Sequence, residues 1–536
     1  MREDLAERSA PETRLPAGAW QSELLDGLAP ADRSLFQLYG TGPRRPIPHA
    51  LVHRAFEAHA AARPAAPAAE HLGTTIGYGE LDRRADRLAR LLASLGVGPG
   101  DRVPVFVHRS LPMLVALLGV LKAGAAYVPQ DIRIAPSAQL RHVLRTTRPR
   151  VVLTLAEYAD RVPVRSGQRL IALDELMTEP DEPGLPPFRP VREPRADDAC
   201  YVLFTSGTTG PPNGVAVTHR NVCNLLHSAP GNLGIGPGQR VAQLLNIAFD
   251  MAAWEILGAL SHGATLLLRG SDFAETARTA DVLIATPTIL AGLDPLRCER
   301  VRTVAVAGEP CPRPLADRWS DVCAFHNGCG PTETTIVNTL QRHRRSAERL
   351  TIGRPTPNNT VYILDEHRRP LPIGAVGEMW AGGAGVSAGY LNNPGLNTER
   401  YLPDPFLGAG HLMFRTRDLG RWTPDGELEH LGRTDDQVKV RGFRVELDGV
   451  SAVLETVAGC GRAVTLKVDD RTLVSFVTPQ DVGTEDARRA VAGALPYYCV
   501  PDLIHACETL PRTGRGKIDK ARLLTLARRL LTEAAS

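Results

Sequence analysis

The sequence predicts an α/β protein with a large N-terminal domain of layered sheets and helices, a small β-subdomain and a small α+β C-terminal domain. A chain of 536 residues is too long for one compact core, so two or more domains are expected. From Leu51 onward, helical segments alternate with short apolar runs, and this alternation is typical of α/β architecture. After about residue 350 the segments become rich in strand-forming residues, which indicates a change of architecture there.

The first 48 residues contain one amphipathic stretch, LLDGLAPADRSLFQLYG. We expect a short helix docked on the body at this stretch, after a loose tail. The alternation that follows is clearest in LDRRADRLARLLASLG, DRVPVFV, LPMLVALLGVLKAG and RPRVVLTL. It continues through RVAQLLNIAF, GATLLLRG, DVLIATP and VRTVAVAG, where apolar runs are separated by Gly and Pro. A large body with several parallel sheets is therefore predicted.

The β-subdomain is predicted from TVYILDE, VGEMWAGG and GELEHLGR. The remaining residues combine short strands with two helical segments, EDARRAVAGAL and KARLLTLARRLL. This mixture indicates a separate small α+β domain at the end of the sequence.

Composition excludes several classes of protein. The formal net charge is only +3, and basic and acidic residues are interspersed, so a nucleic-acid-binding surface is not expected. The nine cysteines form no CxxC pair, which argues against a disulfide framework or zinc ribbon and fits a reducing cytosol. The N-terminus is charged and polar, and no stretch reaches the roughly 18 apolar residues that cross a bilayer.

A glycine-rich loop stands between two apolar strands in CYVLFTSGTTGPPNGVAV, residues 200–217. Glycines let the backbone approach a phosphate, and the hydroxyls of Thr205, Ser206, Thr208 and Thr209 add hydrogen-bond donors. The loop is not the GxxxxGK[ST] motif of nucleotide hydrolases. Taken alone, these residues equally fit a polyphosphate cradle and a surface turn.

Further blocks follow the loop in a fixed order: GPTE (330–333), RTRDLG (415–420), GRTDDQVKVRG (432–442) and GRGKID (514–519). LKAGAAYVPQD (121–131) and LPYYCVP (495–501) are also present. With TSGTTG, this set resembles the adenylate-forming superfamily, and it is most similar to the amino-acid adenylation domains of nonribosomal peptide synthetases. The resemblance spans roughly residues 51–525.

The resemblance implies that ATP, with Mg²⁺, activates a substrate carboxyl group as an acyl adenylate. Because the reaction brings one anion onto another, the site must supply positive charge. The implied catalytic residues are Lys517, which bridges the carboxylate and the α-phosphate, and Glu333, which holds Mg²⁺. Asp418 would bind the ribose hydroxyls and Arg433 would lie beside them. The full implied ATP-binding set is Thr205, Ser206, Gly207, Thr208, Thr209, Gly210, Gly330, Thr332, Asp418 and Arg433.

Asp435 matches the family's hinge, about which a mobile small domain rotates between two half-reactions. We therefore divide the chain into an extension (1–48), a large domain (49–434) and a small lid domain (435–536). The second half-reaction transfers the acyl group to a phosphopantetheine thiol. Because the sequence ends soon after Lys517 without a carrier segment, we expect a stand-alone cytoplasmic enzyme of nonribosomal peptide, antibiotic or related biosynthesis, with a separate carrier protein. Some relatives also need a small MbtH-like protein.

Substrate choice is implied by FDMAAWEI, residues 249–256. Asp250 matches the carboxylate that receives the substrate's α-amino group, since a buried charge needs a partner. Capping of the following helix is a second role open to Asp250. The other implied specificity residues are Met251, Trp254, Ile284, Ala305, Ala307, Gly328, Ile336 and Val337.

No charged side chain is expected in this pocket apart from Asp250 and Lys517. The pocket therefore predicts a neutral, hydrophobic amino acid. Leu-like, aromatic and β-amino acids all stay open.

Three positions depart from the family pattern. Asn213 stands where a Pro-Lys-Gly lysine is usual, Cys329 where an aromatic stacks on adenine, and Arg417 where glycine is usual. Arg417 is a candidate replacement for the missing lysine cation. The departures leave open a degenerate paralogue that binds a partner, and the shared fold leaves open an acyl-CoA ligase, although Asp250 argues against it. GGAGVSA (382–388) fits a dinucleotide-binding pattern, but a turn follows it instead of a helix, so we expect a structural role.

Overall fold

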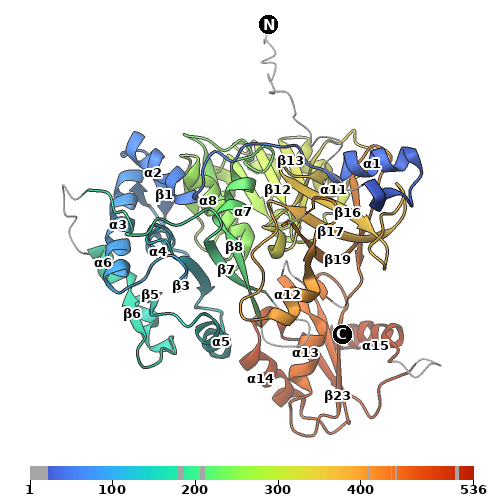
Figure 1. Cartoon of the computed structure of the whole chain (residues 1–536). Coiled ribbons are helices and arrows are strands. Elements are labelled where there is room, and N and C mark those ends of the chain that lie inside the picture. The colour runs from blue at the N-terminus through green and yellow to red at the C-terminus, as the bar shows by residue number, and fades with distance from the viewer. Residues whose placement is uncertain are drawn as a thin grey trace.

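Two parallel sheets with helices between them form the larger part of the molecule (Figure 1). The computed structural model describes residues 22–178, 186–205, 212–408, 410–435, 437–440, 443–512 and 518–535. Among these residues, no helix is both long enough and apolar enough to span a membrane.

The first sheet has six strands, which are parallel except for the last pair. In spatial order they are β6 (Arg169–Ala172), β5 (Val151–Thr154), β3 (Arg102–Val107), β4 (Ala126–Asp131), β7 (Ala199–Thr205) and β8 (Asn213–Thr218). Antiparallel pairing of β7 with β8 places Thr205 opposite Asn213. The glycine-rich loop therefore connects two paired strands.

The second sheet has nine strands, parallel in its centre and antiparallel at both edges. In spatial order they are β15 (Arg354–Pro355), β14 (Thr339–His343), β13 (Ala324–Cys329), β12 (Thr303–Val306), β11 (Val282–Ala285), β9 (Arg240–Gln243), β10 (Thr265–Leu268), β1 (Pro67–His71) and β2 (Thr74–Gly77). The central strands β9 to β12 are almost entirely buried, as expected for a parallel sheet covered on both faces.

The largest apolar core lies between these two sheets. Its helices are α2 (Val52–Ala62), α3 (Tyr78–Ser94), α4 (Leu111–Lys122), α7 (His219–Leu226) and α8 (Asp250–Ser261). All but the first two residues of α4 are buried, because its sequence is apolar on every side. The outer faces carry α5 (Ser137–Thr147), α9 (Phe273–Thr279), α10 (Pro287–Ala291) and α11 (Arg313–Ser320), whereas α6 (Leu173–Thr178) packs beside α4 on the core between the sheets. Short 3₁₀ turns lie at Ala156–Arg161, Pro295–Arg297 and Thr332–Thr334.

A third, antiparallel sheet forms the β-subdomain. It contains β16 (Asn359–Leu364), β17 (Gly377–Gly383), β19 (Leu412–Trp422), β18 (Tyr401–Pro403) and β20 (Leu428–Arg433), and α12 (Pro394–Arg400) lies between β17 and β18 along the chain. The amphipathic N-terminal stretch forms a turn at Ser22–Leu25 and α1 (Pro30–Gly40), which buries Phe36 against Tyr362 and Phe406. The residues directly after the GGAGVSA motif form an isolated bridge and a turn, and the next helix, α12, begins only at Pro394.

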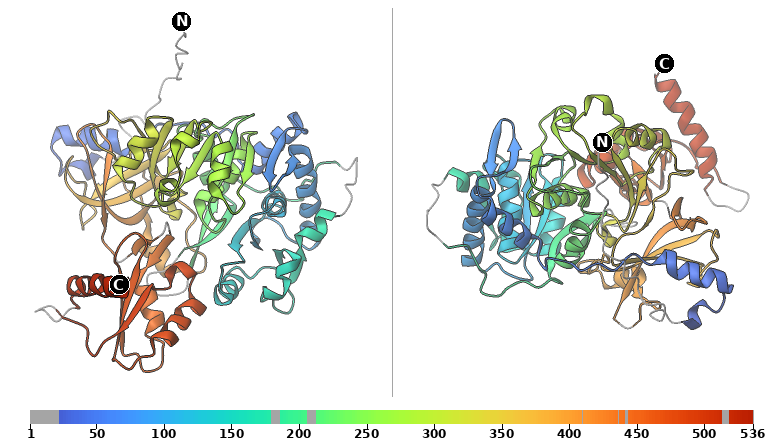
Figure 2. Two further views of the ribbon diagram at one scale, coloured as in Figure 1. Left: turned by 180° about the vertical axis from the view of Figure 1, so that it is seen from behind. Right: turned by 90° about the horizontal axis from the view of Figure 1, so that it is seen from above.

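The small C-terminal part lies below the large part in Figure 1 and in the left view of Figure 2. It contains the hairpin of β21 (Gln437–Val440) and β22 (Phe443–Glu446), the sheet of β23 (Arg462–Lys467), β24 (Leu473–Thr478) and β25 (Leu503–Ala506), α13 (Leu447–Leu454), α14 (Thr484–Ala494), a turn at Tyr497–Cys499 and α15 (Lys520–Ala535). In the described chain, its strands pair only with one another. The predicted α/β fold class is thus confirmed, including the small α+β part.

Glu255 on α8 fixes the chain where β9 ends. It is fully buried, and its carboxylate accepts hydrogen bonds from the backbone N–H groups of Leu244 (2.7 Å) and Leu245 (3.2 Å) and from Gln243 Nε2 (3.1 Å). Burial raises the pKa of Glu255 to about 8, although these hydrogen bonds and the charge of Arg109 oppose the rise. The native protein therefore holds a proton on Glu255 that the unfolded chain, with an ordinary Glu pKa, loses at lower pH.

We predict that this proton makes stability depend on pH. Between about pH 4.5 and the folded pKa of about 8, the free energy of unfolding falls as pH rises, by at most about 1.4 kcal/mol per unit from this group. In Glu255→Gln that contribution is absent. Urea unfolding from pH 5 to pH 9 checks this. The free energy of unfolding of the wild type should fall relative to that of Glu255→Gln as pH rises. A difference between the two proteins that stays constant from pH 5 to pH 9 would show that Glu255 is ionised throughout.

Candidate active site

A cavity of about 750 Å³ lies where the large and small parts meet. The large part lines it with residues at or just beyond the carboxyl ends of β4, β7, β9, β11, β12 and β13, and with residues of β19 and β20. The small part contributes the β21–β22 hairpin, Lys467, Tyr497 and Tyr498. Ligands of α/β proteins bind at the carboxyl ends of parallel strands, so this cavity is the candidate active site.

Asp250 is the first residue of α8 and lines the cavity. The helix cap is Phe249, so Asp250 does not occupy the cap position that one interpretation of the sequence gave it. Burial raises the pKa of Asp250, while the hydroxyl of Thr332, the charge of Lys439 and the N–H of Met251 favour its charged form. A cationic group entering the cavity beside Asp250 would be attracted to this carboxylate.

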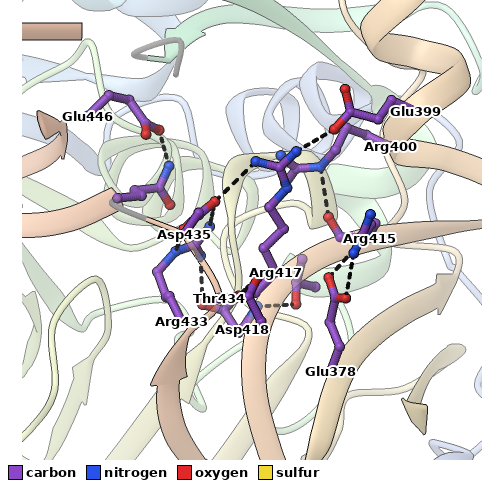
Figure 3. A network of polar contacts seen from close by, with 12 residues as sticks. Glu378, Glu399, Arg400, Arg415, Arg417, Asp418, Arg433, Thr434, Asp435 and Glu446 are labelled. Atoms are coloured by element: carbon purple, nitrogen blue, oxygen red, sulfur yellow. Dashed lines mark hydrogen bonds and ion pairs between the residues drawn. The ribbon is translucent and has the colours of Figure 1, made fainter. Parts of the chain in front are cut away.

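Asp418 and Arg433 are paired across β19 and β20 (Figure 3). Arg433 Nη1 donates to Asp418 Oδ1 at 2.6 Å, and His430 Nε2 lies 3.3 Å from the same oxygen. Burial alone raises the pKa of Asp418, but His430 and Arg433 outweigh burial and hold the pKa below its ordinary value. The side chain is therefore a carboxylate at neutral pH and a suitable acceptor for hydroxyl groups.

Glu333 is fully buried beside the cavity and is not among the residues that line it. Its Oε1 accepts a hydrogen bond from the hydroxyl of Tyr390 at 2.7 Å. Glu333 lies close enough to Asp250 for its charge to raise the Asp250 pKa. A buried, oriented carboxylate fits Mg²⁺, which proteins bind through one or two carboxylates together with substrate phosphates.

Part of the predicted phosphate site lies outside the described residues, namely Ser206, Gly207, Thr208, Thr209 and Gly210. Thr205, which precedes them, lines the cavity, as do Gly330 and Thr332. Lys517 also lies outside the described residues. Its neighbours Arg512 and Ile518 form an isolated β-bridge, and among the described residues none after Tyr498 lines the cavity.

The predicted specificity residues fall into two groups. Met251, Ala307, Gly328 and Ile336 line the cavity, whereas Trp254, Ile284, Ala305 and Val337 are fully buried behind it. Trp254 donates through Nε1 to the carbonyl of Gly231 at 2.7 Å, and Ile284 pairs with Ala305 across β11 and β12. A Cβ on Gly328 would lie 2.9 Å from side-chain carbons of Val337 and Leu340. This layer therefore supports the residues that face the cavity.

The cavity carries more charge than the sequence analysis expected. Asp131, Arg133, Arg269, Glu309, Lys439 and Lys467 line it besides Asp250, Asp418, Arg433 and Asp435. Arg133 is paired with Asp131, and Glu309 accepts hydrogen bonds from the backbone and hydroxyl of Thr288. The expectation missed these residues because it considered only the family's specificity positions.

The three departures from the family pattern have defined surroundings. Asn213 accepts a hydrogen bond from Asn393 Nδ2 at 3.0 Å. Cys329 lines the cavity, and burial raises its pKa to about 12, so the thiol is neutral. The guanidinium of Arg417 faces the carboxylates of Glu399 and Asp435, and Arg417 is not among the cavity-lining residues. The proposal that Arg417 replaces the missing lysine cation is therefore not supported.

Several residues at the cavity were missed by sequence reasoning. Phe249 packs against Phe443 and Tyr498, which stack on each other with ring centroids 4.2 Å apart. These rings join the residue before Asp250 to the small part. Lys439 reaches the neighbourhood of Asp250 from the hairpin. Both Lys439 and Phe443 are in or beside the motif GRTDDQVKVRG, but their position against Asp250 depends on long-range packing with no periodic signal.

Comparisons with known proteins agree with this geometry. A family model described as "AMP-binding enzyme" matches residues 56–391. The chain is similar to adenylate-forming reductase 03009 of Coprinopsis cinerea, with 48% identity over 94% of this chain and 49% of the relative. It is also similar to novobiocin biosynthesis protein H of Streptomyces niveus, with 35% identity over 90% of this chain and 83% of the relative.

Among solved structures, the chain resembles a nonribosomal peptide synthetase protein that contains adenylation and PCP domains and is bound to a vinylsulfonamide inhibitor. The TM-score is 0.76 with 25% identity, covering 91% of this chain and 85% of the other. The chain spans about half the length of the Coprinopsis relatives.

Proposed function

The chain belongs to the AMP-binding enzyme family, and on that premise we propose that it activates a neutral, hydrophobic amino acid as an aminoacyl adenylate and releases pyrophosphate. Adenylate formation is supported by the match to the AMP-binding enzyme family and by the name of the adenylate-forming reductase of Coprinopsis cinerea. The amino-acid substrate is the finer part of the proposal, and it rests on the residues that line the cavity.

One observation carries the proposal: Asp250, Asp418 and Arg433 face the same cavity from different elements. The half-buried carboxylate of Asp250 suits an ammonium group, and the hydrogen-bonded carboxylate of Asp418 suits ribose hydroxyls. An ammonium 4 Å from Asp250 would be attracted by about 4 kcal/mol at an effective dielectric constant near 20. Met251, Ala307 and Ile336 add apolar surface for an uncharged side chain.

In the proposed reaction, a carboxylate oxygen of the amino acid attacks the α-phosphorus of ATP. The bond from that phosphorus to the oxygen of the leaving pyrophosphate breaks. Asp250 orients the substrate amine, Asp418 and Arg433 hold the ribose, and Thr205 lies at the entrance to the phosphate loop. Glu333 would hold Mg²⁺, which supplies positive charge to the phosphates. Lys517 would bridge the reacting carboxylate and phosphate and favour the transition state, where their negative charges meet.

We further propose that the small part turns about Asp435 between two steps. The β21–β22 hairpin lines the cavity, whereas Arg512 and Ile518, the described residues on either side of Lys517, do not. This supports a rotation of the small part before Lys517 acts. The second step would transfer the acyl group to the thiol of a phosphopantetheinylated carrier protein. Similarity to a structure with adenylation and PCP domains supports this acceptor, and parallel assays with coenzyme A test the acyl-CoA ligase alternative.

A second candidate comes from the Coprinopsis relatives, which are 48% and 47% identical and are named adenylate-forming reductases. By that name, adenylate formation in those proteins is associated with a reduction. The carboxyl group activated here would then be destined for reduction instead of peptide synthesis. Both candidates share the adenylation step and differ in the fate of the activated acyl group.

We predict that Asp250→Asn loses amino-acid activation while keeping ATP binding. Removing one partner of a buried charge pair costs about 2–4 kcal/mol, so kcat/KM for the amino acid in pyrophosphate exchange should fall ~30- to 1,000-fold. Calorimetry with ATP alone is the control and should give an unchanged Kd. An unaltered KM for the amino acid would show that Asp250 does not bind its amine.

A screen of pyrophosphate exchange over amino acids, including β-amino acids, tests the function as a whole. Exchange is expected with neutral hydrophobic amino acids and is expected to drop by ~10²-fold or more in Lys517→Ala. Robust exchange only with Asp, Glu, Lys or Arg would contradict the apolar substrate. Absence of exchange with every acid, alongside retained binding of a partner protein, would favour the degenerate paralogue.

A further inference from the structure

Helix α12 begins at a contact with the base of the glycine-rich loop. Its cap residue Asn393 accepts a hydrogen bond from the N–H of Leu396 at 3.2 Å and donates through Nδ2 to Asn213 Oδ1 at 3.0 Å. Asn213 faces Thr205 across β7 and β8. The N-terminal end of α12 is therefore bonded to the strand that leaves the loop.

The middle of α12 is bonded to the segment that orients Glu333. Asn397 accepts a hydrogen bond from the N–H of Tyr390 at 2.7 Å and donates to the carbonyl of Tyr390 at 2.9 Å. The hydroxyl of Tyr390 in turn donates to Glu333 Oε1. A displacement of Glu333 or of Asn213 would therefore act on the same short helix.

The C-terminal end of α12 contacts Arg417 and the strand that carries it (Figure 3). Glu399 pairs with Arg417 Nη2, and Arg417 Nη1 lies 3.5 Å from Asp435 Oδ2. The carbonyl of Arg417 also accepts a hydrogen bond from the N–H of Thr434 at 2.9 Å. Arg400 anchors the helix, because its Nε donates to the carbonyl of Arg415 at 2.9 Å.

Asp435 lies where the chain leaves β20 for the small part. Its carboxylate also accepts hydrogen bonds from Arg433 Nε (2.8 Å) and Nη2 (3.1 Å), and Arg433 reaches Asp418. Charges thus alternate from Asp418 through Arg433, Asp435 and Arg417 to Glu399. Only Glu399, at the end of this row, is largely exposed, and a pair at such a position stabilises little by itself. The side chains of Asp418, Arg433 and Asp435 are less than a fifth exposed.

We propose that α12 couples occupancy of the phosphate end of the cavity to the orientation of the chain at Asp435, with Arg417 as the positioning residue for Asp435. The inference rests on the proposed function, because it takes the nucleotide phosphates to lie beside the loop and Glu333. The seven residues of α12 make a rigid connection of about 10 Å at 1.5 Å per residue. Asn213 and Arg417, two of the departures from the family pattern, are the partners of its two ends.

Hydrogen exchange of the full chain tests the coupling with the probe α,β-methylene-ATP and Mg²⁺. Asn393→Asp keeps an acceptor for the helix cap but removes the donor to Asn213, and Glu399→Gln removes the charge that faces Arg417. Thr398→Ala on the same helix is the matched control, because Thr398 is exposed and its hydroxyl bonds only within α12. The peptides to monitor cover 428–440.

In the wild type and Thr398→Ala, we expect the probe to change exchange of these peptides by ~5-fold or more. In Asn393→Asp and Glu399→Gln that change should fall to less than half, with probe affinity within ~3-fold of wild type. In the double variant, the probe-induced change in exchange should be no smaller than in either single variant, because both substitutions interrupt the same chain of contacts through α12.

The coupling is overturned if wild type binds the probe without a change at 428–440, or if both variants bind it and keep the full change. Failure of wild type to bind the probe by calorimetry would instead overturn the proposed nucleotide site, and the inference with it.

Discussion

Asp250 places a half-buried carboxylate in the cavity at the start of α8, where desolvation disfavours its charge, and the rest of the site is arranged around that charge. A buried charge is costly unless it is paired and hydrogen-bonded. Thr332, the N–H of Met251 and Lys439 each favour the charged form, yet burial still raises the Asp250 pKa. A ligand that brings one more positive charge would therefore be favoured at this position, and this is the physical reason for proposing an ammonium group there.

Two parts of the molecule form the cavity, and the chain passes from the large part to the small part at Thr434 and Asp435. The side chains that hold this crossing also belong to the candidate nucleotide site, because Arg433 binds both Asp418 and Asp435. Rotation of the small part would therefore disturb the surroundings of Asp418. On the other side of the cavity, Phe249 links the residue before Asp250 to Phe443 and Tyr498. Substrate binding and the position of the small part thus involve neighbouring residues.

Much of the fold could be predicted because its elements have strong local patterns. Helix α3 turns Leu81, Leu88 and Leu92 inward from a sequence with regular apolar spacing, and α4 is apolar throughout. The sequence predicted only that Asp418 and Arg433 both lie beside the ribose. The structure adds that the antiparallel strands β19 and β20 place the two residues opposite each other.

The rest depends on contacts between distant segments, which leave no periodic signal. Lys439 approaches Asp250 only because the small part docks on the cavity, and Tyr390 reaches Glu333 only because Asn397 holds its backbone. Arg417 was interpreted as a replacement cation from its charge alone, whereas its partners Glu399 and Asp435 come from other elements. Trp254 and Ala305 lie behind the cavity because almost every residue of α8 and β12 is buried by neighbouring elements.

The central claim is that the cavity selects an amino acid by its ammonium group, and matched substrates test it most directly. Pyrophosphate exchange should be measured for the best amino acid of the screen and for the same carboxylic acid without its amino group. We expect kcat/KM to fall ~100-fold or more for the acid without the amine, since the carboxylate of Asp250 is then desolvated without the cationic partner that the ammonium group would supply. Equal exchange with both acids would contradict this claim. It would favour the second candidate, in which a carboxylic acid without an amino group is activated and then reduced.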